Sequence, residues 1–286
     1  MRAPERADAL VRSVSDTARW AAACRAMESA RHDAHFNDPY AAGLAGDRGM
    51  SIAARSPPQV RNGWPVIART KAIDDLIQRS LAEGCDRVLN LAAGLDARPY
   101  RLDLPASLDW IEADLPALVA EKNAALAHAV PRCRLVREAV DLADPAARAA
   151  FLDRALAGAN RVLVITEGLL MYLTDEVVRS LALDFARPSV AAWILDTLSP
   201  ATRDEVMRRM DETLASAPML FAPPEGIAFF EALGWRTTEM RSLLEEARRL
   251  RRLPWLLQIL AELPLPQPDP RKLARRQWSA VVRLSQ

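Results

Sequence analysis

The sequence predicts an α/β fold built on a mostly parallel sheet with helices on both faces. Two observations predict it. Apolar, β-branched runs alternate with helical patterns through the middle of the chain, and a turn of small residues follows the first run. We expect strands near 87–91, 109–113, 133–140, 161–166 and 190–197, and helices near 97–103, 116–128, 145–157 and 174–185. Right-handed crossovers then place a ligand crevice where the carboxyl ends of the strands meet.

The segment before this core predicts a helical cap. Charged and apolar residues follow helical spacing within 5–30, and Asp38-Pro-Tyr40 ends that region. Residues 43–65 are rich in Gly, Pro and Ser, so we expect a loop there. A helix from Val66 to Leu81 should stop at Gly84. We therefore assign 1–83 to the cap and 84–199 to the core of one domain that spans 1–286.

The segment after Ser199 predicts a helical lid and a last strand. Residues 200–216, 225–233 and 241–262 show helical patterns, interrupted by prolines. We expect 200–262 to form a lid over an acceptor, and 263–286 to form a proline-rich linker and a terminal strand at 278–284. A final strand that adds antiparallel would complete a seven-stranded sheet.

Composition limits the classes of function. The chain has 286 residues and a net charge of +1, which gives no reason to expect a nucleic-acid partner. No apolar run approaches the ~20 residues of a membrane span, and the N-terminus lacks the apolar core of a signal peptide. Cys24, Cys85 and Cys133 are scattered, and His32 and His35 lack a third ligand nearby. We expect a cytoplasmic protein with neither a metal site nor a membrane partner.

The turn after the first core strand predicts a nucleotide-type cofactor. Ala92, Ala93 and Gly94 follow the strand, and Asp114 closes the next one. Small residues let the backbone approach a ligand, and an acid at the end of the second strand can accept both ribose hydroxyls. These features fit NAD or S-adenosylmethionine. A pyrophosphate cradle requires several spaced glycines, so the single Gly94 favours the sulfonium nucleoside.

Further motifs in order along the chain resemble the leucine carboxyl methyltransferase-like family, including polyketide-type O-methyltransferases. They are Ala22-Ala-Cys-Arg25-Ala-Met-Glu28, Asp38-Pro-Tyr40, Ala68-Arg-Thr-Lys-Ala-Ile-Asp74, Asn90-Leu-Ala-Ala-Gly-Leu-Asp96, Glu112-Ala-Asp-Leu-Pro116, Val140-Asp-Leu142 and Thr166-Glu-Gly-Leu-Leu-Met-Tyr-Leu173. The resemblance covers about Thr17 to Leu284. It implies a Rossmann-like class I methyltransferase fold with S-adenosylmethionine as the cofactor.

The resemblance also implies roles for individual residues. Arg69 matches an arginine that pairs with the methionine carboxylate of the cofactor, and Arg25 falls where some members have a lysine with a related role. Glu167 matches an acid near the same end of the cofactor. Asp114 matches the acid that holds the ribose. The pair that contacts the adenine is matched by Asp141 and Leu142, and Tyr172 is matched to the acceptor side.

Each polar candidate has a purely structural alternative. Asp114 can cap the helix that begins near Pro116, and Asp141 can cap one that begins near Pro145. Glu167 can cap the helix after Thr174. Arg69 can form an ion pair with Asp74 or Asp75. The strand-end positions favour the binding roles, because a buried acid is costly without a partner.

The sequence departs from the family in the turn itself. Ala92 stands where the family has the first glycine of Asn-Leu-Gly-Ala-Gly. Its methyl group can crowd the cofactor, or the backbone can accept it if φ at this residue is negative. Ala97 likewise replaces a threonine of the family.

We expect O-methylation of a small-molecule acceptor, either a carboxylate or a phenolic or other hydroxyl group, in polyketide-like secondary metabolism. Two alternatives remain: a nicotinamide-dependent oxidoreductase, and a non-catalytic binding module on the same fold. No histidine lies within the matched motifs, so no general base is identified. An apolar acceptor pocket, or alternatively the core of the lid, would use Met207, Met210, Met219, Phe221, Phe229 and Phe230.

Overall fold

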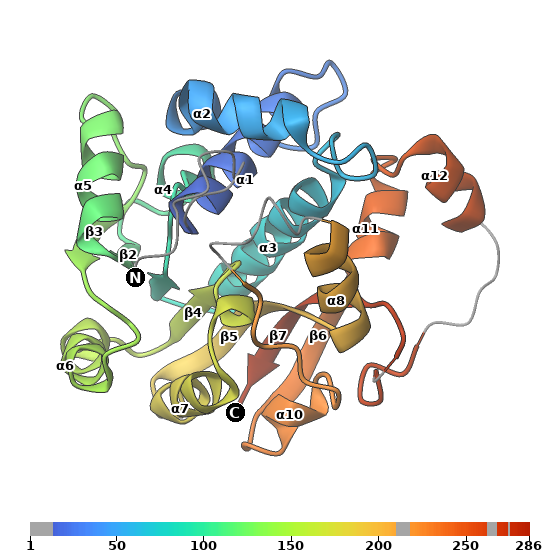
Figure 1. The fold of residues 1–286 in the computed structure, drawn as a ribbon. Helices are drawn as coiled ribbons and strands as arrows, with labels where there is room; N and C mark the ends of the chain where they lie inside the picture. The colour runs from blue at the N-terminus through green and yellow to red at the C-terminus, as the bar shows by residue number, and fades with distance from the viewer. Residues whose placement is uncertain (1–13, 210–217, 262–267, 274) are drawn as a thin grey trace, which may run out of the picture.

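A computed structural model of the chain describes residues 14–209, 218–261, 268–273 and 275–286. Their centre is a seven-stranded sheet in the order β3-β2-β1-β4-β5-β7-β6 (Figure 1). The strands are β1 (Arg87–Leu91), β2 (Asp109–Asp114), β3 (Arg134–Ala139), β4 (Val162–Thr166), β5 (Val190–Leu198), β6 (Arg236–Ser242) and β7 (Ser279–Ser285). Strands β1 to β5 pair in parallel, and β7 lies antiparallel between β5 and β6. This confirms the predicted class of fold.

Helices cover both faces of the sheet, because side chains of a buried strand alternate between two cores. On one face, Val88 and Ile165 pack with α3 (Trp64–Ala82) and α11 (Leu243–Arg249). On the other, Leu89 and Val164 pack with α6 (Pro145–Leu156), α7 (Asp175–Asp184) and the short α10 (Ala228–Glu231). α4 (Arg98–Arg101) and α5 (Pro116–Ala125) follow β1 and β2. Because helices cover both faces of the sheet, a ligand can reach it only at the ends of the strands.

Two predictions about single elements are wrong. The stretch 43–65, expected as a loop, contains helix α2 (Ala41–Arg55), which bends where Gly46 takes φ 55°. The stretch 241–262, expected as helix, begins with the end of β6 and then forms α11 and α12 (Trp255–Ala261). β6 was not predicted, because its Arg-Thr-Thr-Glu-Met-Arg-Ser sequence is polar and lies at the sheet edge beside β7 alone.

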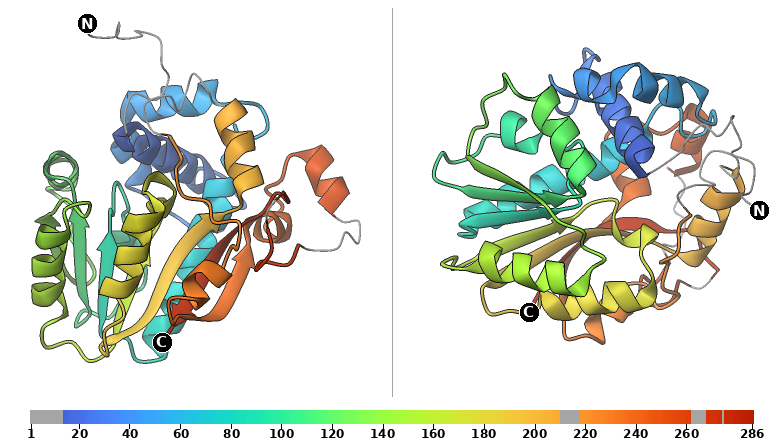
Figure 2. Two further views of the ribbon diagram at one scale, coloured as in Figure 1. Left: turned by 60° about the horizontal axis from the view of Figure 1, so that its bottom comes forward. Right: turned by 60° about the vertical axis from the view of Figure 1, so that its left-hand side comes forward.

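A helical layer covers the carboxyl ends of the parallel strands. α1 (Val14–Ser29) and α2 lie together there, and α8 (Pro200–Arg209) stands beside α2 (Figure 2). A 3₁₀ turn, η1 (Leu170–Tyr172), follows β4 toward the same edge. The predictions for 5–13, for 210–216 with Met210, and for the connector at 263–267 lie outside the described residues. No helix within the described ranges is long and apolar enough to cross a membrane.

Candidate functional site

A cavity of about 470 Å³ opens at the carboxyl ends of β1, β2, β4 and β5, beneath α1 and α2. It gathers every site residue expected from the sequence: Arg25, Arg69, Ala92, Gly94, Asp114, Asp141, Leu142, Glu167 and Tyr172. These residues come from segments as far apart as α1 and η1. The strand order brings the strand-end residues together, and α1 and α3 add Arg25 and Arg69. The crevice predicted at this edge is therefore present.

The turn after β1 is fastened to the end of β2 through one carboxylate. Asp114 accepts a hydrogen bond from the backbone nitrogen of Gly94 at 2.6 Å and one from Leu115 at 2.7 Å. Burial raises the pKa of this carboxyl above its ordinary value, and these two backbone hydrogen bonds oppose the shift. α5 begins at Pro116 without a side-chain cap, so the capping alternative for Asp114 is wrong.

Ala92 has φ of 52°, in the left-handed region that favours glycine. The negative φ under which the sequence tolerates alanine is therefore not the conformation found. Alanine holds this conformation at a cost in free energy that glycine would not have. The methyl group lies where the turn meets the cavity, partly packed against the core.

The end of β3 contributes an acid and an apolar side chain. Asp141 Oδ1 accepts a hydrogen bond from the backbone nitrogen of Ala143 at 2.9 Å, and Leu142 is buried beside it. The cap of α6 is Asp144, which accepts from Ala146 and Ala147. The capping alternative for Asp141 is therefore also wrong, and Asp141 lines the cavity from an exposed position.

Arg69, on α3, lies between two strand ends. Its Nε donates to Glu167 at 2.9 Å and its Nη1 donates to Asp196 at 2.9 Å. Asp196 also accepts from the backbone of Gly168 at 2.6 Å. The alternative that pairs Arg69 with Asp74 or Asp75 is wrong, because those acids bind other basic side chains. Among the described residues Nη2 of Arg69 has no hydrogen-bond partner, so it is open to a ligand in the cavity that Arg69 lines.

Arg98 joins this cluster, and sequence reasoning missed it. The guanidinium group contacts Asp74 at 2.6 Å, Asp96 at 2.8 Å and Glu167 at 2.6 Å, while only 2% of the residue is exposed. Burial alone would raise the pKa of Glu167, but Arg98 and Arg69 outweigh it and hold that pKa below its ordinary value. Glu167 is therefore an ionised ligand of two arginines, and Thr174 caps α7 in its place.

Arg25 reaches the cavity from α1. Its Nε donates to Asp38 at 2.9 Å and its Nη2 donates to the carbonyl oxygen of Leu95 at 2.7 Å. These contacts attach the helical cap to the loop after the turn. The sequence suggested no role for Asp38 or Asp196. It suggested the wrong partner for Asp74, which binds Arg98 and Arg101. The only available signal was an acid closing a predicted strand, which applies to Asp196.

The part of the cavity beyond β4 is apolar, and of the side chains offered for an acceptor pocket or a lid core, Met219 lines it. Met207 packs with Met219 in a small cluster around Ile52 and does not line the cavity. Phe221, Phe229 and Phe230 are buried in the main core, with Phe230 edge-on to Trp193 at 5.4 Å. The indole of Trp193 on β5 gives these rings an apolar surface to pack on, away from the cavity. Tyr172 does line the cavity, and burial raises the pKa of its phenol.

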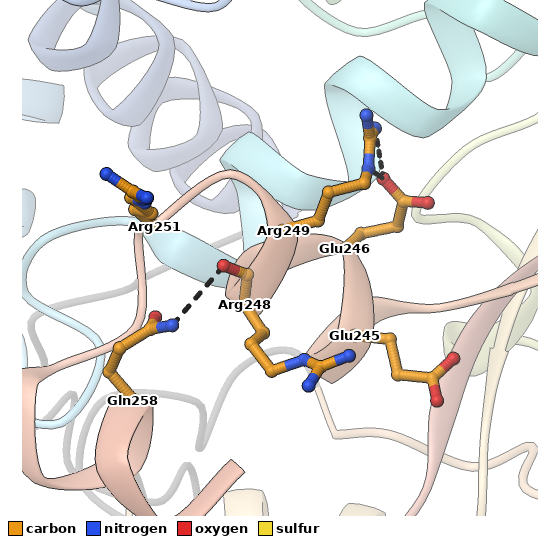
Figure 3. Close-up of a pocket in the computed structure, with 6 residues that line it drawn as sticks. All are labelled: Glu245, Glu246, Arg248, Arg249, Arg251 and Gln258. Carbon is orange, nitrogen blue, oxygen red and sulfur yellow. Dashed lines mark hydrogen bonds and ion pairs between the residues drawn. The ribbon is translucent and has the colours of Figure 1, made fainter. Parts of the chain in front are cut away.

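A second hollow lies between α11 and α12, away from the strand ends (Figure 3). It is lined by Glu245, Glu246, Arg248, Arg249, Arg251 and Gln258. Arg249 pairs with Glu246 three residues earlier, as on an ordinary solvated helix face. Among the described residues no group of three or more His, Cys, Asp or Glu side chains could hold a metal ion.

Comparisons with known proteins identify relatives of this chain. A sequence model described as leucine carboxyl methyltransferase matches residues 18–186. A Frankia alni protein named as an S-adenosyl-L-methionine-dependent methyltransferase is 34% identical over 240 residues, which covers 77% of this chain and 82% of that protein. A Streptomyces avermitilis protein named in the same way is 34% identical over 250 residues, covering 81% and 86%.

Solved structures show the same fold at low sequence identity. A methyltransferase from Thermobifida fusca YX has a TM-score of 0.54 at 16% identity, covering 98% of this chain and 96% of that one. A DUF574 family protein from Streptomyces avermitilis has a TM-score of 0.55 at 13% identity, covering 93% and 96%. At these identities the likeness concerns the fold alone.

Proposed function

We propose a function for this chain on the premise that it belongs to the leucine carboxyl methyltransferase family. As a member, it is an S-adenosylmethionine-dependent methyltransferase. Membership in this family selects S-adenosylmethionine over NAD as the cofactor, and it rules out the nicotinamide-dependent oxidoreductase. What we propose beyond this is O-methylation of a small-molecule acceptor, carboxylate or hydroxyl, in the cytoplasm and in polyketide-like secondary metabolism.

Successive strand ends around the cavity offer suitable partners for the ribose, the adenine and the amino-acid end of this cofactor. We assign the ribose hydroxyls to Asp114, which faces the turn of Ala92 and Gly94. The adenine is assigned to the end of β3, where Leu142 offers an apolar face and Asp141 a carboxylate. Small residues at the turn leave room for the backbone to approach the nucleoside.

The amino-acid end of the cofactor carries both a carboxylate and an ammonium group, and the charged cluster offers both signs. Arg69 presents Nη2 for the carboxylate, with Arg25 nearby on α1. Glu167 remains ionised between Arg69 and Arg98, and so can accept from the ammonium group. A mixed cluster fits a zwitterion better than it fits a lone anion.

When bound, S-adenosylmethionine supplies an electrophilic methyl group on a sulfonium centre. The chain's own contribution is alignment and exclusion of water. Asp114 and Arg69 hold the two ends of the cofactor, and the helical layer of α1 and α2 covers the strand ends. Fixing the nucleophile in line with the methyl group removes much of the entropic barrier to a two-body reaction. Tyr172 is proposed to lie on the acceptor side.

The observation that carries this proposal is the Asp114 carboxylate, tied to Gly94 across one end of a cavity whose other end is apolar. Calorimetric titration with S-adenosylhomocysteine tests it. The wild-type chain should bind, and Asp114→Ala should lose at least about tenfold in affinity, since it removes a charge-assisted hydrogen bond to the ribose.

The control is Asp153→Ala on α6, whose carboxylate is 68% exposed and lies outside the cavity lining. It should bind like the wild type. Circular dichroism of both variants verifies that they fold. A folded Asp114→Ala chain with unchanged affinity would remove Asp114 from the cofactor site.

A further inference from the structure

The cavity divides into two chemically different halves along the strand order. The half at the ends of β1, β2 and β3 holds the turn and the acids assigned to the nucleoside. The other half lies at the ends of β4 and β5, and we call it the acceptor half. Its apolar walls include Ile52 and Val206, which pack with Met219, and Met171 and Leu198, which pack with the same methionine.

The arginines that line the cavity are already neutralised by the chain. Arg25 lies 2.9 Å from Asp38, and Arg69 lies 2.9 Å from both Glu167 and Asp196. Arg98 contacts three carboxylates. No other arginine or lysine occurs among the described lining residues. The cofactor's own carboxylate then takes the remaining donors of Arg69. An anionic acceptor would therefore find no unpaired cationic side chain among the described lining residues, and its one nearby counter-charge would be the sulfonium of the cofactor.

Two carboxylates lie at the boundary of the two halves, and each is paired with an arginine. Glu167 and Asp196 are both largely buried, with side chains 16% and 5% exposed. An ionised carboxylate accepts hydrogen bonds and donates none, so it favours a partner that brings its own proton. An anionic acceptor in an apolar chamber would lose its solvation without gaining an unpaired cationic side chain.

We propose that the acceptor half takes an uncharged, apolar hydroxy compound, a phenol or an alcohol, in preference to a carboxylate. This rests on the function proposed above and narrows it. In the transfer, the hydroxyl oxygen forms the new bond to the methyl carbon, the carbon–sulfur bond breaks with its electron pair on sulfur, and the hydroxyl proton is released to solvent. The preference separates this chain from the carboxyl chemistry in the family's name.

The test compares two probes that share one ring system, 2-naphthol and 2-naphthoate, by calorimetry on the full chain saturated with S-adenosylhomocysteine at pH 7. This product carries no sulfonium charge, so the comparison reports on the side chains of the acceptor half alone. At this pH a phenol with a pKa of about 10 is neutral, and a carboxylic acid with a pKa of about 4 is ionised. We expect 2-naphthol to bind at least about tenfold more tightly, because the acid must bury an uncompensated charge. Equal or tighter binding of 2-naphthoate, or binding of neither probe, would overturn the inference.

A pair of variants tests the electrostatic cause. Val206 lies on α8 at the wall of the acceptor half and is only partly buried. Val206→Arg adds a cation there, and Val206→Gln adds a polar side chain without a charge. We expect the arginine variant to bind 2-naphthoate roughly fivefold more tightly than the glutamine variant does. Equal affinities in the two variants would contradict the charge argument.

The titration with S-adenosylhomocysteine separates the two proposals. If the wild-type chain does not bind it, the proposed cofactor site fails. If it binds while the acid probe equals or exceeds the phenol, the cofactor site stands and only the acceptor class is wrong.

Discussion

Ala92 holds a backbone conformation that costs an L-residue free energy. Its φ of 52° lies where the Cβ atom crowds the following carbonyl oxygen. Ala92→Gly should therefore raise the free energy of unfolding by about 1 kcal/mol, measured by urea denaturation. Ala150→Gly, on the exposed face of α6, should instead lower it by about 0.5–1 kcal/mol. A loss of stability in Ala92→Gly would show that packing of the methyl group outweighs the strain.

The candidate site was only partly accessible from the sequence. Asp114, Asp141 and Glu167 close predicted strands, so their positions follow from the parallel sheet alone. Arg98 gives no such signal, because its carboxylates lie on α3, in its own loop and after β4. Which acid neutralises which arginine depends on side-chain geometry in three dimensions, and a strand pattern does not contain it.

At the scale of elements, α2 shows how glycine misleads a reading of the sequence. Gly43, Gly46 and Gly49 suggested a loop, yet the segment is helical. Gly49 is required by close packing: a Cβ atom there would lie 2.6 Å from the carbonyl oxygen of Arg19 on α1. Gly49 alone of these three glycines serves the contact between α1 and α2, which periodicity within one segment cannot reveal. Edge strand β6 was missed for the opposite reason, since its side chains are mainly polar.

This contact predicts opposite effects for two similar substitutions in α2. Gly49→Ala should lower the free energy of unfolding by about 1–3 kcal/mol, because the helices must separate to admit the methyl group. Gly43→Ala meets nothing within 4 Å and should be neutral or stabilising by up to about 1 kcal/mol. Denaturation of both variants by urea measures the difference. Equal changes in the two would contradict the packing role of Gly49.

At the scale of the whole molecule, the charged cluster joins the helical cap to the sheet. Arg25 and Asp38 belong to the cap region, Arg69 and Asp74 to α3, and Arg98 to the segment after β1. Removing water from so many charges is unfavourable, so the cluster stabilises the fold only while each partner remains ionised. Folding and the presentation of the site therefore depend on the same carboxylates.

Those carboxylates give stability a definite dependence on pH. Burial would raise the pKa values of Asp96 and Glu167, but nearby arginines, Arg98 first among them, hold both below their ordinary values. A pKa lowered on folding means that the unfolded chain binds protons more readily. The pKa values of these two groups in the unfolded chain are about 4. The stability they provide is therefore present above about pH 4 and is lost as the pH falls toward their lower pKa values in the folded chain.

Burial raises the pKa of Asp114, so its contribution has the opposite sign: the stability it provides is lost as the pH rises through its folded pKa. Within the cluster the two carboxylates with lowered pKa values, Asp96 and Glu167, outnumber it. Urea denaturation at steps from pH 7 to pH 3.5 should show a plateau and then a decline below about pH 5. Glu167→Gln removes one of the titrating groups, so the free energy of unfolding of this variant should fall less steeply with decreasing pH. Glu245→Gln makes the same chemical change at an exposed position on α11 and should leave the slope as it is. If Glu167→Gln declines as steeply as the wild type, the acid sensitivity comes from carboxylates outside this cluster.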